Sequence, residues 1–303
     1  MEIRVLRYFL TVAREETISR AADILHITQP TLSRQLSQME EDMGVRLFER
    51  GPRKISLTAE GRLLRRRAEE ILELVGKTED EIRHQDQTLS GVISIGCGDL
   101  GAVQRLPDLI RPFTEHYPSV TFDLYTASAD HIRDRLDRGV TDIGLLLEPV
   151  NMEKYDYVRL SRHEEWVVIL PPDSPLAQKE AVTPQDLKDV PLILPRRAAV
   201  RSELARWFGP DYEHLHVLCT SNLTSSSSVL VHSGLACSIA VLGSISFWDR
   251  TQICVRPLSP ALTGSSVFAW KRNQPFSPAA ERFIQFVKDT VDAHQETPAA
   301  PHK

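Results

Sequence analysis

The stretch HITQPTLSRQLSQMEEDMG, residues His26–Gly44, decides how the first part of this chain is built. Its apolar side chains recur at spacings of 4, 3 and 4 residues, at Leu32, Leu36, Met39 and Met43. Residues with this spacing share one face of a helix and are expected in a core. Thr28 is a suitable N-cap, and Pro30 fits a first turn because no backbone N–H is needed there. The helix is therefore expected to begin near Gln29 and to end at Gly44.

The face opposite the apolar stripe is polar, and its N-terminal half contains no acid. Its members are Gln29, Pro30, Thr31, Ser33 and Arg34, followed by Gln38. Arg and Gln can make paired hydrogen bonds to base edges, Thr and Ser can bind phosphate or base, and an apolar surface can contact a thymine methyl. The acids Glu40, Glu41 and Asp42 lie at the other end. This half of the helix is therefore predicted to contact DNA.

The preceding segment TISRAADIL, residues 17–25, is predicted to form a short helix with Thr17 as its N-cap. Small side chains at Ala21 and Ala22 let a second helix cross closely, and only the connection HIT separates the two. Such a pair indicates a helix-turn-helix, although His26 stands where glycine is frequent. An ordinary helical hairpin is the alternative. The expected core of the motif is Ala21, Ala22, Leu25, Ile27, Leu32 and Leu36.

After Gly44, the run VRLFERGPRKISLTAEG (residues 45–61) is predicted to form two short strands around a Gly51-Pro52 turn. Its basic tip carries Arg50, Arg53 and Lys54. These side chains are expected to bind phosphates beside the recognition helix, as a wing does. The alternative is a solvated turn.

A long helix is expected from residue 59 to about 87, because the segment has no proline and few glycines. Its seam repeats at spacings of 4, 3, 4, 3 and 4, at Leu64, Ala68, Ile71, Val75, Thr78 and Ile82. A seam with this period packs lengthwise on a partner helix. We expect dimerisation through the apolar members Leu64, Ala68, Ile71, Val75 and Ile82. The alternative is packing on the C-terminal domain of the same chain.

From LSGVISIGCG (residues 89–98) onward, short apolar strands alternate with helical segments. This order predicts βαβ units and a mainly parallel sheet. The chain of 303 residues is long enough for two or three compact units. The Pro- and Ala-rich tail, residues 297–303, is expected to be disordered.

Composition excludes several classes of protein. The chain is 42% hydrophobic and 25% charged, with a net charge of −5. Residues 1–67 hold 13 Lys and Arg against 9 Asp and Glu, so this segment carries +4 and the rest −9, which favours a polyanion-binding head. No apolar run approaches the roughly 20 residues that span a bilayer, and the first residues do not form a secretory signal. We therefore expect a cytoplasmic protein without membrane contact.

The chain lacks signatures of an enzyme. No G-x-S-x-G, P-loop or paired-histidine metal motif occurs, and the turn GCGDLG departs from a G-x-G-x-x-G order. Its four cysteines form no zinc spacing, so no metal or cofactor is expected. A redox-sensing pair, Cys219 with Cys237, remains an alternative. A solute-binding protein would share the α/β lobes, but it predicts a signal peptide and no basic helical head.

The run FLTVAREETISRAADILHITQPTLSRQLSQMEEDMGVRLFERGPRKISLTAEGRLL, residues 9–64, strongly resembles the N-terminal domain of LysR-type transcriptional regulators. The resemblance includes the Ala-Ala pair, TQPTLSRQL, the LGVxLFxR pattern with Met43 for its first Leu, and an LTAEG close to LTxAG. Later segments such as LPDLIRPFTEHYP, GVTDIGLL and VHSGLACSIAVL are similar to the effector domain of that family. The resemblance therefore spans essentially the whole chain.

The resemblance implies an α+β multidomain protein. It comprises a winged helix-turn-helix (residues 1–58), a linker helix (59–88) and a bilobal α/β effector domain of the type-2 periplasmic-binding-protein kind (89–296). Lobe one is placed at 92–161 plus 267–295 and lobe two at 162–266. The implied partners are promoter DNA, which the protein bends, a small-molecule effector, RNA polymerase, and further copies in a homodimer or a dimer-of-dimers tetramer. The DNA contacts of the family fall here on Gln29, Pro30, Thr31, Ser33 and Arg34, with Arg50 and Arg53 in the wing.

An effector cleft is expected where strand ends meet helix N-termini, which attract anions. In lobe one this place holds Asp99, Leu100 and Gly101. The family often has Ser or Thr there, so Asp99 would already satisfy the helix beginning near Ala102 and repel an acidic ligand. Alternatively, Asp99 recognises a donor-bearing ligand or is only a cap.

Lobe two contributes further candidates for the effector cleft at the ends of its strands. They are Arg196, Arg197, Ser221 and Asn222. The two arginines follow a predicted strand and can bind a carboxylate or phosphate through paired hydrogen bonds. The alternative is that they are surface charges.

Overall fold

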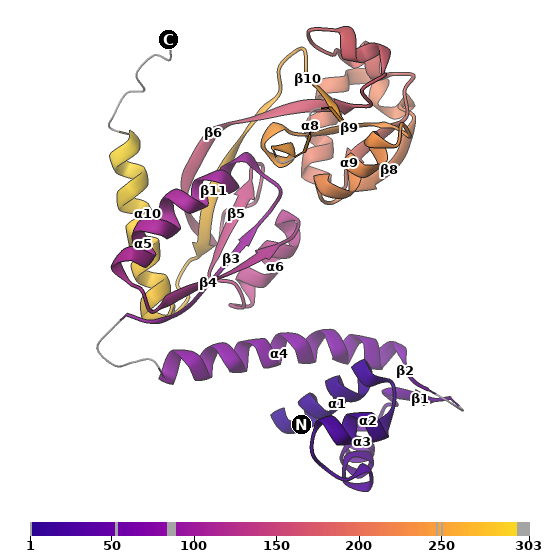
Figure 1. Ribbon diagram of the computed structural model, residues 1–303, viewed down its shortest axis with the longest axis vertical. Coiled ribbons are helices and arrows are strands. Elements are labelled where there is room, and N and C mark those ends of the chain that lie inside the picture. The colour runs from indigo at the N-terminus through magenta and orange to yellow at the C-terminus, as the bar shows by residue number, and fades with distance from the viewer. Residues whose placement is uncertain (1, 52–53, 84–88, 247, 250, 296–303) are drawn as a thin grey trace. The chain divides into compact units, whose positions relative to one another are not determined.

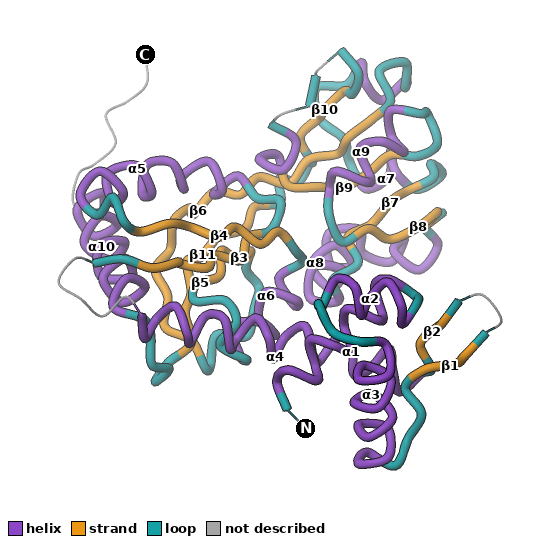
Figure 2. Tube along the Cα trace, turned by 60° about the horizontal axis from the view of Figure 1, so that its bottom comes forward, coloured by secondary structure: helices purple, strands orange, loops and turns teal. Residues whose placement is uncertain are grey.

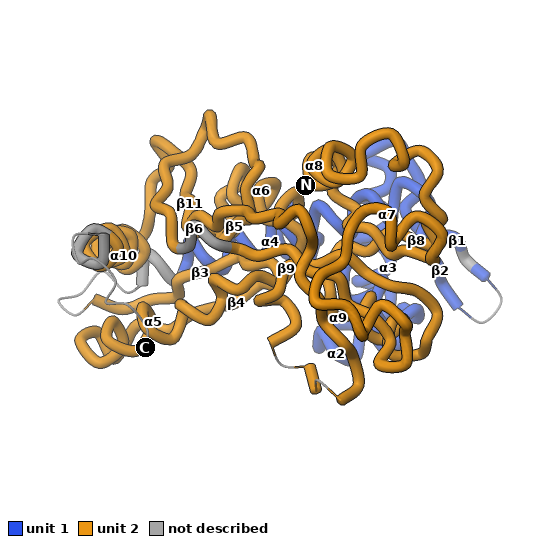
Figure 3. The backbone as a smooth tube through the Cα atoms, turned by 90° about the horizontal axis from the view of Figure 1, so that it is seen from above, with its two compact units in different colours: residues 1–83 blue, residues 84–303 orange. Residues whose placement is uncertain are grey.

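The computed structural model describes residues 2–51, 54–83, 89–246, 248–249 and 251–295. The chain divides into two compact units, residues 1–83 and 84–303, which Figure 3 colours separately. Residues 59–83 of the predicted linker helix fall within the first of these units. Residues 84–88, the predicted last part of that helix, and the tail 297–303 lie outside the described residues.

The N-terminal unit has four helices and a two-stranded sheet among its described residues (Figure 1). They are α1 (Ile3–Glu15), α2 (Ile18–Ile24), α3 (Gln29–Met43), β1 (Phe48–Arg50), β2 (Ile55–Leu57) and α4 (Ala59–Arg83). The quoted stretch forms α3 with the expected ends, because the Thr28 hydroxyl accepts a hydrogen bond from the Thr31 N–H and Gly44 takes a φ of 67°. His26 in the turn has a φ of 54°, the conformation that glycine usually supplies.

The core of this unit joins α1, α2, α3 and the start of α4. It contains Phe9, Val12, Ala21, Ala22, Leu32, Leu36, Met39, Leu47, Leu64 and Ala68. The prediction that Met43 belongs to this core is wrong, since its side chain is 42% exposed. Met43 stands in the last turn of α3, and the buried stripe of that helix ends at Met39.

At the start of helix α4, Thr58 acts as a cap and the backbone of Gly61 lies close to the backbone of Leu47. The Thr58 hydroxyl accepts a hydrogen bond from the Gly61 N–H at 2.9 Å and donates one to the Arg46 carbonyl at 2.8 Å. A Cβ on Gly61 would lie 2.1 Å from the Leu47 carbonyl oxygen. The LTAEG run therefore needs threonine as a cap and glycine for a close approach of two backbones.

The C-terminal unit is built on a nine-stranded sheet in the order β4-β3-β5-β11-β6-β9-β7-β8, with β10 paired to β6. The strands are β3 (Gly91–Cys97), β4 (Val120–Thr126), β5 (Ile143–Leu147), β6 (Tyr155–Leu170), β7 (Leu192–Pro195), β8 (Val217–Ser221), β9 (Cys237–Val241), β10 (Cys254–Pro257) and β11 (Thr263–Lys271).

Helices cover this sheet and connect its strands. They are η1 (Gly101–Arg105), α5 (Leu106–His116), α6 (Ala129–Asp137), η2 (Pro175–Gln178), α7 (Pro184–Leu187), α8 (Ala198–Phe208), η3 (Gly209–His214), α9 (Thr224–His232), η4 (Leu242–Ile245) and α10 (Pro278–Gln295). Helices α5 and α10 lie side by side in lobe one (Figure 1), where Phe113 and Phe283 stack edge to face at 4.9 Å between ring centroids.

The sheet is mixed, so the expectation of a mainly parallel sheet is wrong for its centre. Strands β3, β4 and β5 are parallel in lobe one, as are β7, β8 and β9 in lobe two. Strands β6, β10 and β11 run antiparallel to their neighbours. Long β6 pairs with β11 in lobe one and with β9 and β10 in lobe two, so it passes from one lobe to the other (Figure 2). The boundary expected after residue 161 thus falls inside one strand.

Candidate nucleic-acid interface and ligand cavity

The polar face of α3 is exposed as the sequence indicates. Gln29, Pro30, Thr31, Arg34 and Gln38 are exposed, and Ser33 is half-buried. Leu32 and Leu36 on the other side are buried. The helix thus separates into one face that holds the unit together and one that is available to a partner.

Several of these polar side chains have partners within the chain. The Ser19 hydroxyl donates to the Gln29 amide oxygen at 3.2 Å, and the Gln38 amide donates to Asp42 at 3.0 Å. Arg34 has no such partner among the described residues. Arg34 is therefore the side chain of α3 most ready to bind a base edge or a phosphate.

The wing is attached to the corner between α1 and α2. The Glu16 carbonyl oxygen accepts a hydrogen bond from the Ile55 N–H at 2.8 Å, and its carboxylate accepts one from the Lys54 ammonium. Lys54, predicted to bind phosphate, is thus paired with an acid, although both side chains remain exposed. Arg53 and the side chain of Arg50 lie outside the described residues.

The C-terminal part of α3 is tied to the wing by Glu40, a residue that sequence reasoning placed among unassigned acids. Its carboxylate accepts hydrogen bonds from the Leu47 N–H at 2.6 Å and the Phe48 N–H at 3.1 Å. These bonds fix β1 relative to α3. Glu40 therefore positions the wing beside the recognition helix.

The predicted dimer seam of α4 is partly used within the chain. Leu64 and Ala68 are buried in the core of the N-terminal unit, and Ile71 packs against that core. Val75 is half-buried, and the side chain of Ile82 lies outside the described residues. Leu63 and Leu74 are 51% and 42% exposed, so the exposed apolar surface of α4 lies beside the predicted seam.

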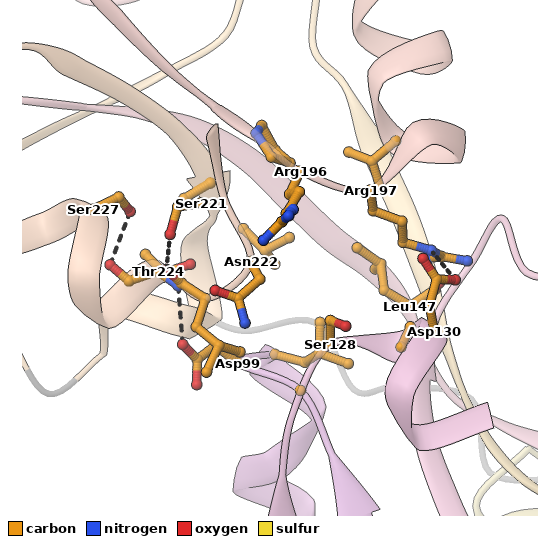
Figure 4. Close-up of a pocket in the computed structure, with 18 of the residues that line it drawn as sticks. Asp99, Ser128, Asp130, Leu147, Arg196, Arg197, Ser221, Asn222, Thr224 and Ser227 are labelled. Carbon is orange, nitrogen blue, oxygen red and sulfur yellow. Dashed lines mark hydrogen bonds and ion pairs between the residues drawn. The ribbon is translucent and has the colours of Figure 1, made fainter. Parts of the chain in front are cut away.

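A cavity of about 580 Å³ lies between the two lobes of the C-terminal unit. Lobe one contributes Gly98–Leu100 and Ala127–His131, and lobe two contributes Leu194–Ala198 and Ser221–Thr224. Six of the seven predicted effector-binding residues line it: Asp99, Leu100, Arg196, Arg197, Ser221 and Asn222. Figure 4 shows five of these six, all but Leu100, labelled around one space.

Asp99 caps a helix of lobe two, whereas the sequence predicts that it caps the helix following it in lobe one. Its carboxylate accepts a hydrogen bond from the Thr224 N–H at 3.0 Å, at the first residue of α9 (Figure 4). Asp99 therefore joins the two lobes across the cavity. The N–H groups at the start of η1, the helix that follows Asp99 in sequence, are bound by a different side chain.

That side chain is Glu164, which the sequence did not single out. Its buried carboxylate, 3% exposed, accepts hydrogen bonds from the Gly101 N–H at 3.0 Å and the Ala102 N–H at 2.9 Å. Gly101 lies away from the cavity, contrary to expectation, because it packs on lobe two. A Cβ on Gly243 would lie 2.0 Å from the Gly101 Cα. The lobes thus touch backbone to backbone beside Glu164.

Arg197 joins the lobes at the other side of the cavity (Figure 4). Its guanidinium donates to the Leu147 carbonyl oxygen at 2.8 Å and to the Pro149 carbonyl oxygen, and lies 3.5 Å from the Asp130 carboxylate. Burial lowers the pKa of the Arg197 guanidinium, and the nearby Asp130 partly offsets that effect. The side chain is only 11% exposed, so Arg197 is a structural bridge and not a surface charge.

The cavity wall has further members that sequence reasoning missed. Apolar surface comes from Trp166, Leu145, Leu147, Leu194 and Val200. Ser128 and His131, which also line the cavity, share a hydrogen bond of 2.8 Å. Trp166 lies just after the point where β6 leaves lobe one. Only the three-dimensional crossing of β6 brings it to the cavity, so no local pattern could have indicated it.

The described residues contain no group of three or more His, Cys, Asp or Glu side chains that could hold a metal ion. None of the described helices is both long and apolar enough to cross a membrane.

Comparison with known proteins agrees with this architecture. Residues 86–292 match the family model of the LysR substrate binding domain. Residues 3–62 match the model of the bacterial regulatory helix-turn-helix protein, lysR family. The chain belongs to the LysR family. It is a DNA-binding transcriptional regulator with an effector-binding domain.

Relatives within the LysR family match this chain along nearly its whole length. The uncharacterized HTH-type transcriptional regulator YybE of Bacillus subtilis is 30% identical over 95% of this chain and 98% of its own. The Hca operon transcriptional activator HcaR of Escherichia coli is 29% identical over 96% and 98%. The crystal structure of CbnR, a LysR family transcriptional regulator, superposes with a TM-score of 0.76 at 25% identity over 96% and 99%. CbnR has also been solved in complex with its target DNA (TM-score 0.73, 24% identity, 96% and 100%).

The redox alternative for this LysR-family chain meets a geometric obstacle. Cys219 in β8 and Cys237 in β9 flank β7, so two strand spacings of about 4.8 Å separate them. A disulfide requires Cα atoms within about 7 Å. The two side chains also pack into different apolar clusters. Burial raises the pKa of the Cys237 thiol to about 11, which suppresses its thiolate at neutral pH.

Proposed function

We propose that this regulator binds specific sites in duplex DNA through α3, and that a small molecule in the cavity between the lobes changes how it binds and bends that DNA. The observation that carries the proposal is the division of α3 into a buried apolar face and an exposed polar one. Helices of this kind enter the major groove with their N-terminal residues against base edges. The complex of CbnR with its target DNA supports the same use of the fold.

The residues of α3 divide by the contacts that their chemistry allows. Arg34 can donate two hydrogen bonds to a guanine, and Gln29 can pair with an adenine once its bond to Ser19 opens. Pro30 offers an apolar surface to a thymine methyl, and Thr31, Ser33 and Gln38 can reach bases or phosphates. The wing residues Arg50, Arg53 and Lys54 are proposed to bind phosphates, which adds affinity without sequence preference.

Effector control is proposed to act through the relative position of the lobes. The cavity has walls from both lobes, so a ligand contacts both at once. A ligand shifts a conformational equilibrium only as far as it prefers one state. A molecule that bridges the lobes therefore stabilises one lobe arrangement and, through it, one spacing of the DNA-binding units.

Self-association is proposed to use α4. Beyond Leu72, no described residue of α4 packs into the core of the N-terminal unit, and Leu74 and Val75 follow there. Leu63 and Leu74 are 11 residues apart, so they lie within about 20° of each other around the helix. A second copy of the chain can pack on Leu63 and Leu74 while Leu64 and Ala68 stay buried in the core of their own chain.

The test is selection of duplexes from a random-sequence library with the full-length chain. The proposal expects enrichment of two related half-sites at a fixed spacing, because a symmetric dimer reads symmetric DNA. Enrichment of no sequence over the starting library would contradict it. The selected duplex then serves to follow DNA bending while metabolites are added.

A further inference from the structure

Two sets of backbone N–H groups that could hold an anion, one in the cavity wall and one outside it, are already bound by carboxylates of the chain. Asp99 accepts the Thr224 N–H at the start of α9. Glu164 accepts the Gly101 and Ala102 N–H groups at the start of η1. Only the first of these sites is in the cavity wall, and an acidic group of a ligand placed there would meet the like charge of Asp99.

Arg197, one of the two arginines in the cavity wall, also has hydrogen-bond partners within the chain. The Arg197 guanidinium holds the Leu147 and Pro149 carbonyl oxygens and lies beside Asp130. The Arg197 side chain is mostly buried, and these contacts attach it to lobe one. A ligand can use Arg197 only by breaking contacts that join the lobes.

Arg196 remains. Its side chain is exposed in the cavity wall, and within the described ranges no carboxylate and no hydrogen-bond acceptor is paired with its guanidinium. Figure 4 shows Arg196 directed toward Asn222, whose side-chain amide also has no partner in this part of the chain. A guanidinium with five N–H donors matches a carboxylate in a paired geometry.

Apolar atoms make up most of the cavity wall, and Ser128, His131 and Ser227 add polar groups to it. Leu100, Leu147, Trp166, Leu194 and Val200 line the cavity with apolar surface. Its volume of about 580 Å³ suits a molecule well beyond the size of a single small anion. An uncharged, mainly apolar body can therefore occupy the space next to Arg196.

We propose that the ligand of this cavity is a monoanion, with one carboxylate-type group bound by Arg196 and Asn222 and an apolar body against Trp166. A second acidic group is selected against by Asp99, whose carboxylate lines the cavity. This inference rests on the proposed function, in which the cavity is the effector site, and adds the charge and polarity of the effector.

The test uses four probes of one length: octanoate, octanamide, octylamine and octanedioate (suberate). Binding to the full-length chain is measured by calorimetry and by Trp fluorescence, since all four tryptophans lie in residues 84–303 and Trp166 lines the cavity. Octanoate is expected to bind at least tenfold more tightly than each of the other three. Tighter or equal binding of octylamine, octanamide or suberate, or binding of none of the four, would overturn the proposal.

Three variants locate the charge recognition. Arg196→Gln is expected to weaken octanoate at least tenfold, whereas Arg201→Gln, an equal loss of charge on exposed α8 surface, leaves its affinity unchanged. Asp99→Asn is expected to improve suberate binding by at least tenfold. Unchanged octanoate affinity in Arg196→Gln, or unchanged suberate affinity in Asp99→Asn, counts against the assignment.

Failure of this inference can be told apart from failure of the proposed function. Octanoate that binds at Arg196 without changing DNA bending contradicts effector control and supports the charge assignment. DNA bending that responds to octylamine and not to octanoate contradicts the charge assignment and supports effector control.

Discussion

Asp99 of lobe one accepts a hydrogen bond from the Thr224 N–H of lobe two at 3.0 Å, so a carboxylate from one lobe caps a helix of the other. The contact couples the separation of the lobes to the stability of α9. Any movement that opens the cavity on this side must break it.

Replacing Asp99 by alanine is expected to destabilise the C-terminal unit. The loss of a helix cap costs about 0.5–2 kcal/mol in free energy of unfolding. Urea unfolding followed by Trp fluorescence measures it, because the tryptophans report on this unit alone. Asp123→Ala, at an exposed position of β4, is the control. Equal unfolding midpoints for both variants would show that the cap contributes nothing.

Glu164→Gln is expected to lower the free energy of unfolding of the same unit by about 1.5–3 kcal/mol, the range for hydrogen bonds to a charged group. Its carboxylate is buried and accepts two N–H groups, whereas a glutamine amide has one accepting oxygen. Glu165→Gln changes the next, exposed residue in the same way. If the two substitutions shift the urea midpoint equally, the bonds of Glu164 to η1 have no special weight.

Gly61→Ala is expected to destabilise the N-terminal unit by about 1–3 kcal/mol, the usual cost of overpacking. The new Cβ would lie 2.1 Å from the Leu47 carbonyl oxygen. Gly76→Ala in the same helix meets nothing within 4 Å and is expected to stabilise by about 0.5–1 kcal/mol. Circular dichroism at 222 nm follows both, since the N-terminal unit has no tryptophan. A stable Gly61→Ala variant with normal DNA affinity contradicts the close approach.

Peroxide is expected to leave DNA binding unchanged and to form no Cys219–Cys237 disulfide. Strand β7 separates the two residues, and the raised pKa of Cys237 keeps its thiol protonated up to about pH 11. The reactivity of the Cys237 thiol toward peroxide should therefore rise only as the pH approaches about 11. Mass spectrometry of peroxide-treated protein checks the prediction, and a Cys219–Cys237 peptide at neutral pH would refute it.

Local patterns in the sequence were sufficient for α3. Its cap at Thr28, its end at Gly44 and its buried residues Leu32 and Leu36 all follow from periodicity and capping chemistry. Met43 shares the same periodicity but is exposed, because periodicity alone does not show which positions of a helix are covered by the rest of the fold.

Contacts between distant residues were beyond such patterns. Glu164 binds Gly101 across 63 positions, and Asp99 binds Thr224 across 125. Both interactions depend on how the lobes meet. The residue type at Asp99 correctly suggested a capping carboxylate, but only the fold shows which helix it caps.

Affinity for DNA should also respond to the wing. Arg53→Ala is expected to weaken binding to every duplex alike and to reduce the slope of log K against log salt by about 1. A loss confined to one sequence would instead make Arg53 a base reader.

DNA recognition through α3 is tested most directly by the affinity of Arg34→Ala for the selected duplex and for each single-base-pair change in it, measured by fluorescence anisotropy at fixed salt. Arg34 is the exposed, unpaired cation of α3 among the described residues. Recognition through α3 predicts a loss of about 1–3 kcal/mol in binding free energy and relaxed preference at one base pair of each half-site. Arg272→Ala, which removes an arginine from the C-terminal unit, should bind as the parent does. An Arg34→Ala variant with the affinity and sequence preference of the parent would contradict recognition through α3.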